Sequence, residues 1–450
     1  MQKLWQKKYS LGQEAEEYCF GDTVVLDNKL IKYDVLGSIA HAQMLAKIGL
    51  ITSAEFGQLK KCLLEIIALQ KAREFEVKFG DEDVHTKIEN HLIDKLGIPG
   101  KKIHTGRSRN DQVLVDLRLY TKENLFVMAE ESIKLIEAFL NFAKQHEFVP
   151  MPGYTHMQKG MPSSIGLWAA SFAEGLLDDL ELLKAAFKHN DQSPLGSAAA
   201  YGVPLPLDRE LSAQLLGFSK VQNNSLYAQV SRGKSHLSVM AALSQIMLTL
   251  SRFAQDLLLF TTSEFNFFTI DERLCTGSSI MPQKKNLDIM EVLRARSHIV
   301  IAHQQAVASV IAGLPSGYNT DFGETKDPFM RSIEIATASL QLCNLVIKSL
   351  KPNTKVLEQA CTKELYATHA AYKLVENGLP FREAYQKVGL STNVLWTLDK
   401  IQTLKISKHS GATGNLGLSK TKAQKKVAQK WWQEKQAFYI QSINNLKEVI

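Results

Sequence analysis

The sequence has little cysteine, and its cysteines show no paired spacing. Five occur in 450 residues, at positions 19, 62, 275, 343 and 361, and no two of them form a CxxC pair. An odd number of scattered thiols argues against a disulfide framework and against a zinc site built from closely spaced cysteines. We therefore expect free thiols in a reducing compartment, with the cytoplasm as the location.

Long apolar runs and strong charge are also missing. The N-terminal stretch MQKLWQKKYSLGQEAEEY has no apolar segment of signal-peptide length, and apolar segments elsewhere are broken by charges such as Arg252 and Asp256. We expect neither secretion nor a membrane span. The net charge of +7 is spread along the chain without a block of five like charges, so we expect no nucleic-acid partner. A basic site for an acidic small molecule explains the excess equally well.

What the sequence does contain is long helical periodicity. With 45% hydrophobic and 22% charged residues it has the composition of a folded soluble protein, and its twelve prolines cluster in a few places. From Leu237 to Leu258, apolar residues recur every three or four positions, which predicts one buried helix face. Similar runs span 111–147, 163–189, 286–312 and 328–348. We predict an all-α protein with an elongated helix bundle, completed by partner subunits because such long helices cannot bury their apolar faces in one small globule.

Two turns divide this helical chain. The first is Ile98-Pro99-Gly100-Lys101-Lys102, and the second is Leu350-Lys351-Pro352-Asn353. Proline and glycine at such positions end helices. We predict an N-terminal helical domain at 1–103, a central bundle domain at 104–351 and a small C-terminal helical domain at 352–450.

Polar stretches lie at the predicted ends of the long helices, at 81–86, 104–111, 153–158 and 277–291. Helix N-termini attract anions, and an arginine beside an asparagine, as in Arg109 and Asn110, suits a carboxylate. Each stretch also has an ordinary structural interpretation. HTGRSRND can be a capped helix start with solvated arginines, and His156 can be a structural histidine.

The segment GSSIMPQKKN, residues 277–286, differs from the others because its serines stand beside lysines and are not needed as a cap if Asn286 caps the next helix. It lacks the Gly-x-Ser-x-Gly elbow of serine hydrolases and the residue order of a phosphate-binding loop. A serine near cations has a lowered proton affinity and can act as a base on a carbon acid.

Removing a proton next to a carboxylate creates a doubly charged intermediate, which Lys285 and Asn286 could stabilise. His156, backed by a carboxylate such as Glu291, is a candidate for the remaining proton. Neither a metal-ligand motif nor a nucleotide loop accompanies these residues. The residues therefore favour acid/base chemistry on a polycarboxylate, with no cofactor and no metal.

These stretches resemble a known family. GSSIMPQKKN is similar to the signature loop of the fumarase/aspartase superfamily, whose members eliminate an amine or water from a succinyl group to release fumarate. The stretches DEDVHT, KIHTGRSRNDQ, PGYTHMQ, SPLGS with LDRE, and LPSGYN resemble its argininosuccinate lyase branch. The resemblance runs from about Leu26 to Arg382. It implies an all-α three-domain subunit, a homotetramer around a shared bundle, active sites built from three subunits, and cofactor-free release of L-arginine and fumarate.

The resemblance also implies roles for individual residues. Ser279 matches the catalytic base and Lys285 the cation that faces the carbanion, while Thr155 and His156 match the other side of the scissile bond with Glu291 as the partner of the histidine. The remaining matches concern substrate binding and its support: Arg109, Asn110 and Asn286 for the carboxylates, Tyr318 and Lys326 for the arginine portion, Arg232 and Thr23 as further contacts, and Asp81, Asp83 and Ser108 as supporting residues.

The chain departs from the family pattern at three positions. Gly323 stands where a glutamine usually contacts the amino-acid end of the substrate, Leu287 replaces a common proline, and Thr23 replaces a serine. Two other functions therefore stay open: the same elimination with a different amine, and a non-catalytic structural relative. Retention of Ser279 and Lys285, together with His156 and Asn110, argues against the structural relative.

Overall fold

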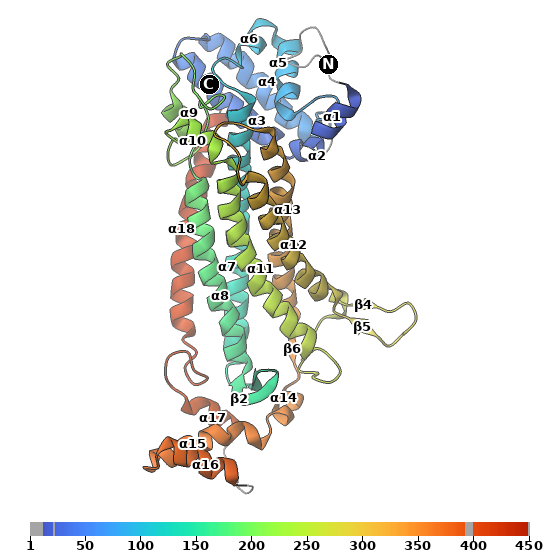
Figure 1. Ribbon diagram of the computed structural model, residues 1–450, viewed down its shortest axis with the longest axis vertical. Coiled ribbons are helices and arrows are strands. Elements are labelled where there is room, and N and C mark those ends of the chain that lie inside the picture. Colours follow the sequence, from blue (N-terminus) through green and yellow to red (C-terminus); the bar gives the residue numbers. More distant parts are fainter. Residues whose placement is uncertain (1–11, 21–22, 392–398, 449–450) are drawn as a thin grey trace.

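The computed structural model describes residues 12–20, 23–391 and 399–448, and these residues form an elongated, nearly all-α subunit (Figure 1). The all-α prediction is confirmed. The helices are α1 (Gln13–Phe20), α2 (Thr23–Asp27), α3 (Ile31–Lys47), α4 (Ser53–Lys71), α5 (Val84–Leu96), α6 (Ile98–Lys102), α7 (Arg109–Gln145), α8 (Ile165–Asn190), α9 (Arg209–Leu215), α10 (Ser225–Val230), α11 (Arg232–Phe260), α12 (Asp288–Ile311), α13 (Lys326–Ser349), α14 (Thr354–Ala360), α15 (Ala367–Glu376), α16 (Phe381–Leu390), α17 (Lys400–Ile406) and α18 (Leu418–Lys447). Short 3₁₀ turns are η1 (Glu272–Leu274), η2 (Thr320–Thr325) and η3 (Lys363–Tyr366).

The long helices α7, α8, α11, α12, α13 and α18 run side by side along the main axis (Figure 1). The apolar stripe predicted from Leu237 is buried at six positions of α11 and half-buried at its two ends, Leu237 and Leu258. Facing helices supply aromatic rings: Phe139 of α7 packs against Phe172 of α8 and Phe253 of α11, at centroid distances of 5.4 and 5.0 Å. Burial of these faces holds the bundle together, because removing apolar surface from water is the dominant favourable term in folding.

Helix α11 is long and apolar enough to cross a membrane by length and composition, the one such helix in the described ranges. It packs against α8, α12 and α13. Its position between these helices is that of a bundle core helix.

Helices α3 to α6 form the head of the molecule, and α14 to α17 form its foot (Figure 1). The first segment predicted as a dividing turn forms helix α6 of the head and packs on α5 and α4, and the second contains β6 just after the end of α13. Helix α18, however, returns along α7 and α8, and its Trp432 and Tyr439 belong to the same core as the bundle. The C-terminal segment is therefore shared between the foot and the bundle.

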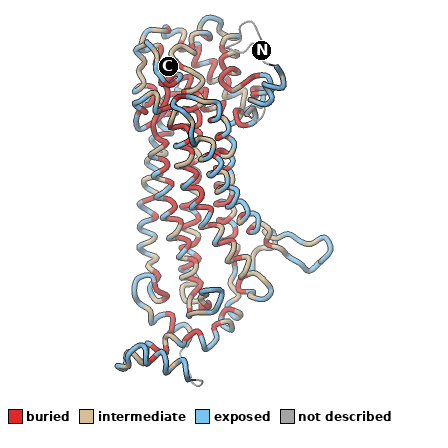
Figure 2. Tube along the Cα trace, viewed as in Figure 1, coloured by how far each residue is buried: buried red, intermediate tan, exposed pale blue. Residues whose placement is uncertain are grey.

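Two antiparallel hairpins project from the bundle. Strands β1 (Pro150–Thr155) and β2 (Gln158–Ser164) pair from Pro150↔Ser164 to Thr155↔Gln158 at the foot, and β4 (Thr276–Gly277) pairs with β5 (Lys285–Asn286) at the side. A third pair joins β3 (Phe268–Thr269) to β6 (Lys351–Pro352). Figure 2 shows that the β4–β5 hairpin is mostly exposed and projects from the bundle, whose interior is buried.

Candidate active site

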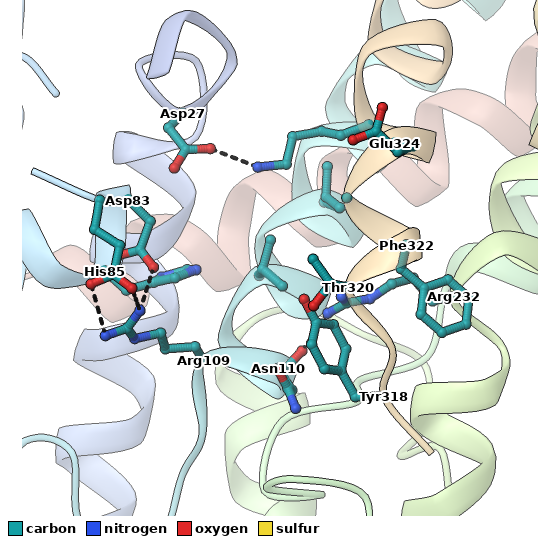
Figure 3. Close-up of a pocket in the computed structure, with 15 residues that line it drawn as sticks. Asp27, Asp83, His85, Arg109, Asn110, Arg232, Tyr318, Thr320, Phe322 and Glu324 are labelled. Atoms are coloured by element: carbon teal, nitrogen blue, oxygen red, sulfur yellow. Dashed lines mark hydrogen bonds and ion pairs between the residues drawn. The ribbon is translucent and has the colours of Figure 1, made fainter. Parts of the chain in front are cut away.

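A cavity of about 340 Å³ lies where the head meets the bundle (Figure 3). It collects the N-terminal ends of α5, α7, α11 and α13, together with η2. Since helix N-termini carry unpaired N–H groups and partial positive charge, this is a favourable place for anionic groups. Its walls are lined by Asp27, Glu82, Asp83, His85, Arg109, Asn110, Val113, Leu117, Arg232, Tyr318, Thr320, Phe322, Gly323, Glu324 and Lys326.

The start of α7 is anchored by its cap. Ser108 and Asp111 form a capping box, in which the Ser108 backbone N–H donates to Asp111 Oδ1 at 2.8 Å. Asp111 Oδ2 accepts from the backbone N–H groups of Gly196 and Ala198 at 2.8 and 3.0 Å, and burial raises the pKa of Asp111 despite these bonds. Ser108 therefore supports the site as a cap, as the structural interpretation of HTGRSRND predicts. The other half of that interpretation, solvated arginines, is wrong: Arg107 is buried and donates to Ser38.

Arg109 is paired with carboxylates of its own chain. Its Nη1 lies 2.6 Å from Glu82 Oε1 and 3.2 Å from Asp83 Oδ2, and its Nη2 lies 3.3 Å from Glu82 Oε2 (Figure 3). Burial lowers the pKa of Arg109, but Asp83 and Glu82 outweigh it and raise the pKa overall. Asp83 also caps α5 by accepting from the Thr86 N–H, and Asp81 pairs with Lys87 at 3.1 Å. The acidic residues thus hold Arg109 and the start of α5 in place.

Arg232 forms the opposite wall of the cavity. Its guanidinium carbon lies 5.1 Å from the ring centroid of Tyr318 and 5.8 Å from that of Phe322, and its Nη2 donates to the Asn110 carbonyl at 2.7 Å. Arg232 is 3% exposed, and burial lowers its pKa. Its Nε has no hydrogen-bond partner among the described residues. A buried cation with an unused donor can hold a carboxylate of a ligand.

Lys326 and Gly323 complete the wall beside η2. The Lys326 ammonium pairs with Asp27 at 2.7 Å, and Asp27 also accepts from the Val84 N–H at 3.0 Å. A methyl group added at Gly323 would meet nothing within 4 Å, so the cavity is open there. Thr23 begins α2, but its side chain lies outside the described part of the structure.

The two serines of the β4–β5 loop differ in their hydrogen bonding. Ser278 Oγ accepts from the N–H groups of Ile280 and Met281 at 3.3 and 3.0 Å, whereas exposed Ser279 has no hydrogen-bond partner in the described chain. Ser278 shapes the turn and Ser279 presents its hydroxyl outward. Exposed Lys285 pairs with Glu272. The expectation that Asn286 caps the next helix is wrong: Leu287 is the N-cap of α12, without a side-chain cap, and Asn286 pairs in β5 with Thr276.

Thr155 and His156 lie at the tip of the β1–β2 hairpin, both exposed, with His156 at φ 53°. Glu291, the predicted partner of His156, lies exposed in the first turn of α12. No hydrogen bond or ion pair joins these two side chains within the described chain. One subunit therefore carries the predicted site residues at three separate places, namely the cavity, the β4–β5 loop and the β1–β2 hairpin (Figure 1).

The cavity also contains a histidine that the sequence analysis did not assign. His85 Nδ1 lies 2.5 Å from Asp34 Oδ2 and 3.8 Å from Asp116 Oδ2, all three side chains being buried. Burial lowers the pKa of His85, but Asp34 outweighs it and raises the pKa, while burial and Asp34 raise the pKa of Asp116. His85 stands in the DEDVHT stretch, but Asp34 lies in an apolar helix 51 residues earlier and gave no signal.

Comparison with known proteins agrees with this arrangement. A lyase family matches residues 13–302. The argininosuccinate lyase of Thermotoga neapolitana is 41% identical over 387 residues, covering 86% of this chain and 97% of the relative, and that of Phocaeicola vulgatus is 42% identical over 417 residues, covering 92% and 93%. This chain belongs to the argininosuccinate lyase family.

Solved structures agree on the fold of this argininosuccinate lyase family member. An EDDS lyase in complex with formate superposes with a TM-score of 0.83 at 21% identity, covering 98% of this chain and 95% of that chain. A class II fumarase from Schistosoma mansoni gives 0.71 at 17% identity, covering 86% and 93%. The predicted superfamily, fold and lyase class are confirmed.

Proposed function

We propose that this protein cleaves argininosuccinate into L-arginine and fumarate, as the names of its relatives suggest, in sites completed by neighbouring subunits of a homotetramer. The observation that carries the proposal is the exposed Ser279 hydroxyl, which has no hydrogen-bond partner among the described residues and stands on the same loop as Lys285, remote from the charged cavity of the same chain. Such a loop can act in catalysis if it closes over the cavity of another subunit.

In this mechanism Ser279 takes the proton from the succinyl carbon. The ammonium of Lys285, released from its pair with Glu272, and the amide of Asn286 face the carboxylate on which negative charge develops, and their charge and dipole lower the barrier. The electron pair of the broken C–H bond is first held on the adjacent carboxylate and then forms the double bond of fumarate as the C–N bond breaks, and the nitrogen keeps the C–N electron pair, takes up a proton and leaves with arginine. Thr155 and His156, with Glu291 as the partner of the histidine, act at the leaving nitrogen.

The cavity supplies the binding groups. Arg232 and Asn110 are placed for a carboxylate, and Tyr318 stands at the mouth, 40% exposed. The carboxylates of Asp27, Glu82, Asp83 and Glu324 give the same cavity an acidic side that suits the guanidinium of the arginine portion. Arg109 and Lys326 are held by ion pairs, so they contribute by sharing their donors or by exchanging partners when substrate enters.

A second function follows from Gly323. Because the cavity is open at this residue, the chain can accommodate a different amine on the succinyl group. The elimination steps at Ser279 and Lys285 are the same for both substrates. We also propose a soluble cytoplasmic enzyme, without cofactor or metal in the reaction, with domains at 1–103, 104–351 and 352–450, the last of which contributes α18 to the bundle.

The decisive experiment follows fumarate by its ultraviolet absorbance after argininosuccinate is added to purified protein. Ser279→Ala should lower kcat by about 10²–10⁴, the usual contribution of a general base. Ser278→Ala is the matched control, since Ser278 only shapes the turn, and it should retain more activity. Absence of fumarate with the unaltered protein would reject the argininosuccinate assignment, and an active Ser279→Ala variant would reject the assigned base. Light scattering tests the tetramer.

A further inference from the structure

A group of potential metal ligands lies in the head, outside the cavity lining. Cys62 and Glu65 are three residues apart on α4, so they share one face of that helix, and His91 faces them from α5. One sulfur, nitrogen or oxygen ligand atom from each residue lies within 4.8 Å of the other two. The group combines the three side-chain types that most often bind zinc.

The side chain of Cys62 and the Nε2 atom of half-buried His91 are buried, whereas Glu65 is exposed. Cys62 is 5% exposed, and its thiol has no hydrogen bond within the described ranges. The Nε2 atom of His91 is buried without a hydrogen-bond partner among the same residues, and its ring meets Phe75 edge-on at 5.5 Å. A buried imidazole nitrogen without a partner is unfavourable. A histidine kept only for packing would be expected to have this nitrogen bonded.

We propose that Cys62, Glu65 and His91 bind a divalent transition-metal ion, with Zn²⁺ as the best match. Sulfur, nitrogen and oxygen ligands together suit Zn²⁺ rather than Mg²⁺ or Ca²⁺, and three protein ligands leave the fourth tetrahedral position to water. Metal–ligand bonds of about 2.0–2.3 Å place tetrahedral ligands about 3.3–3.8 Å apart. The three ligand atoms lie within 4.8 Å of one another. Side-chain rotations that shift these atoms by roughly 1 Å therefore bring them to the spacing of a tetrahedral metal site.

Neighbouring residues influence how the three ligands bind the metal ion. Burial lowers the pKa of His91, as does Lys95. Burial and Glu65 raise the pKa of Cys62, and the thiol must lose its proton to bind the ion. On binding, the S–H bond breaks, the sulfur binds the ion and the proton passes to solvent. Lys95 pairs with Glu65 at 3.5 Å and competes with the metal for that carboxylate.

The other cluster of potential ligands, Asp34, His85 and Asp116, does not support the same inference. His85 Nδ1 is already bonded to Asp34, and the pKa of His85 is raised by that carboxylate despite burial, which favours the protonated ring. A protonated imidazole cannot bind a metal. His85 also lines the cavity and belongs to the proposed active site.

The test uses the full chain after treatment with a chelator and its removal. Titration with Zn²⁺ by calorimetry should give one ion per subunit, and Co²⁺ should produce a thiolate-to-cobalt charge-transfer band in the near ultraviolet. Cys62→Ser and His91→Gln should each weaken binding by about tenfold or more, and Cys62→Ser should abolish the band. Lys95→Met should strengthen binding, because the competing cation is removed.

Two matched controls keep the result specific. Cys361→Ser removes another buried thiol and His409→Gln another imidazole, and neither should change the affinity or the band. Circular dichroism checks that each variant is folded. Absence of binding, a band that survives Cys62→Ser in folded protein, or equal losses in the control variants would each overturn the proposal.

Discussion

Arg109 donates two hydrogen bonds to the Glu82 carboxylate, from Nη1 to Oε1 at 2.6 Å and from Nη2 to Oε2 at 3.3 Å. Glu82 is buried and has φ 71°, a left-handed conformation that few residues other than glycine adopt. The pair therefore ties the start of α7 to a strained segment just before α5. It also determines where the acidic side of the cavity lies.

Because of this pair, we expect Arg109→Lys to destabilise the protein and to weaken substrate binding. Lysine cannot make two parallel contacts with a carboxylate, so we expect the free energy of unfolding to fall by about 1.5–3 kcal/mol and KM for argininosuccinate to rise. Urea unfolding and steady-state kinetics measure the two effects. Arg273→Lys is the stability control, since the Arg273–Asp271 pair is exposed and should change the free energy by no more than about 1 kcal/mol. Unchanged stability in Arg109→Lys would mean that the pair contributes nothing to folding.

The separation of Ser279 from His156 predicts complementation between subunits. Ser279→Ala and His156→Asn should each be inactive alone. When they are co-expressed or refolded together, some sites receive the intact loop from one subunit and the intact hairpin from another, and activity should return. Ser279→Ala mixed with Lys285→Met is the control: both residues lie on one loop, so no mixed site is intact. Fumarate formation is the measurement, and failure of the first mixture to recover would contradict shared sites.

Gly323 offers a test of substrate choice. The cavity has space for a side chain there, and the backbone of Gly323 is not in the left-handed region, so glutamine should be tolerated. If a glutamine bonds to a charged group of the substrate, about 1.5–3 kcal/mol is gained and KM should fall by roughly tenfold or more. Gly389→Gln, in open space on α16, is the control and should leave KM unchanged. An unchanged or higher KM in Gly323→Gln would favour the alternative amine.

Asp179 predicts a pH dependence of stability. Burial raises its pKa to about 6 although Thr249 donates to it at 2.8 Å. The folded state therefore binds this proton more tightly than the unfolded state, whose pKa is near 3.9. Its contribution is most favourable below pH 4 and is lost as pH rises through 6, an effect of order 3 kcal/mol above that pH.

Asp179→Asn should accordingly raise the free energy of unfolding at pH 8, by about 1–3 kcal/mol, with little change at pH 4. Urea unfolding at both pH values and equal protein concentration measures this. Exposed Asp178→Asn is the neighbouring control and should have a smaller effect. Equal effects of Asp179→Asn at both pH values would contradict the assignment.

Parts of this structure could be predicted from local sequence. The three-and-four spacing in α11 predicted the buried face that the bundle uses, and the capped helix start offered for HTGRSRND is the start of α7, where the structure identifies Ser108 as the cap. These predictions succeed because helix periodicity and capping depend on residues only a few positions apart. The GSSIMPQKKN loop likewise indicated proton removal from carbon, although only the structure separated Ser278, which shapes the turn, from Ser279.

The sequence by itself determined the all-α bundle and the kind of chemistry, through short-range patterns of apolar, capping and charged residues. Tertiary structure alone decided the pairing of the charges. Lys326 meets Asp27 across 299 positions, and His85 meets Asp34 across 51. Such pairs depend on where whole helices end in space, which local periodicity does not encode. For the same reason only the fold revealed that Ser279 and His156 stand apart in one subunit, and that Cys62 faces His91.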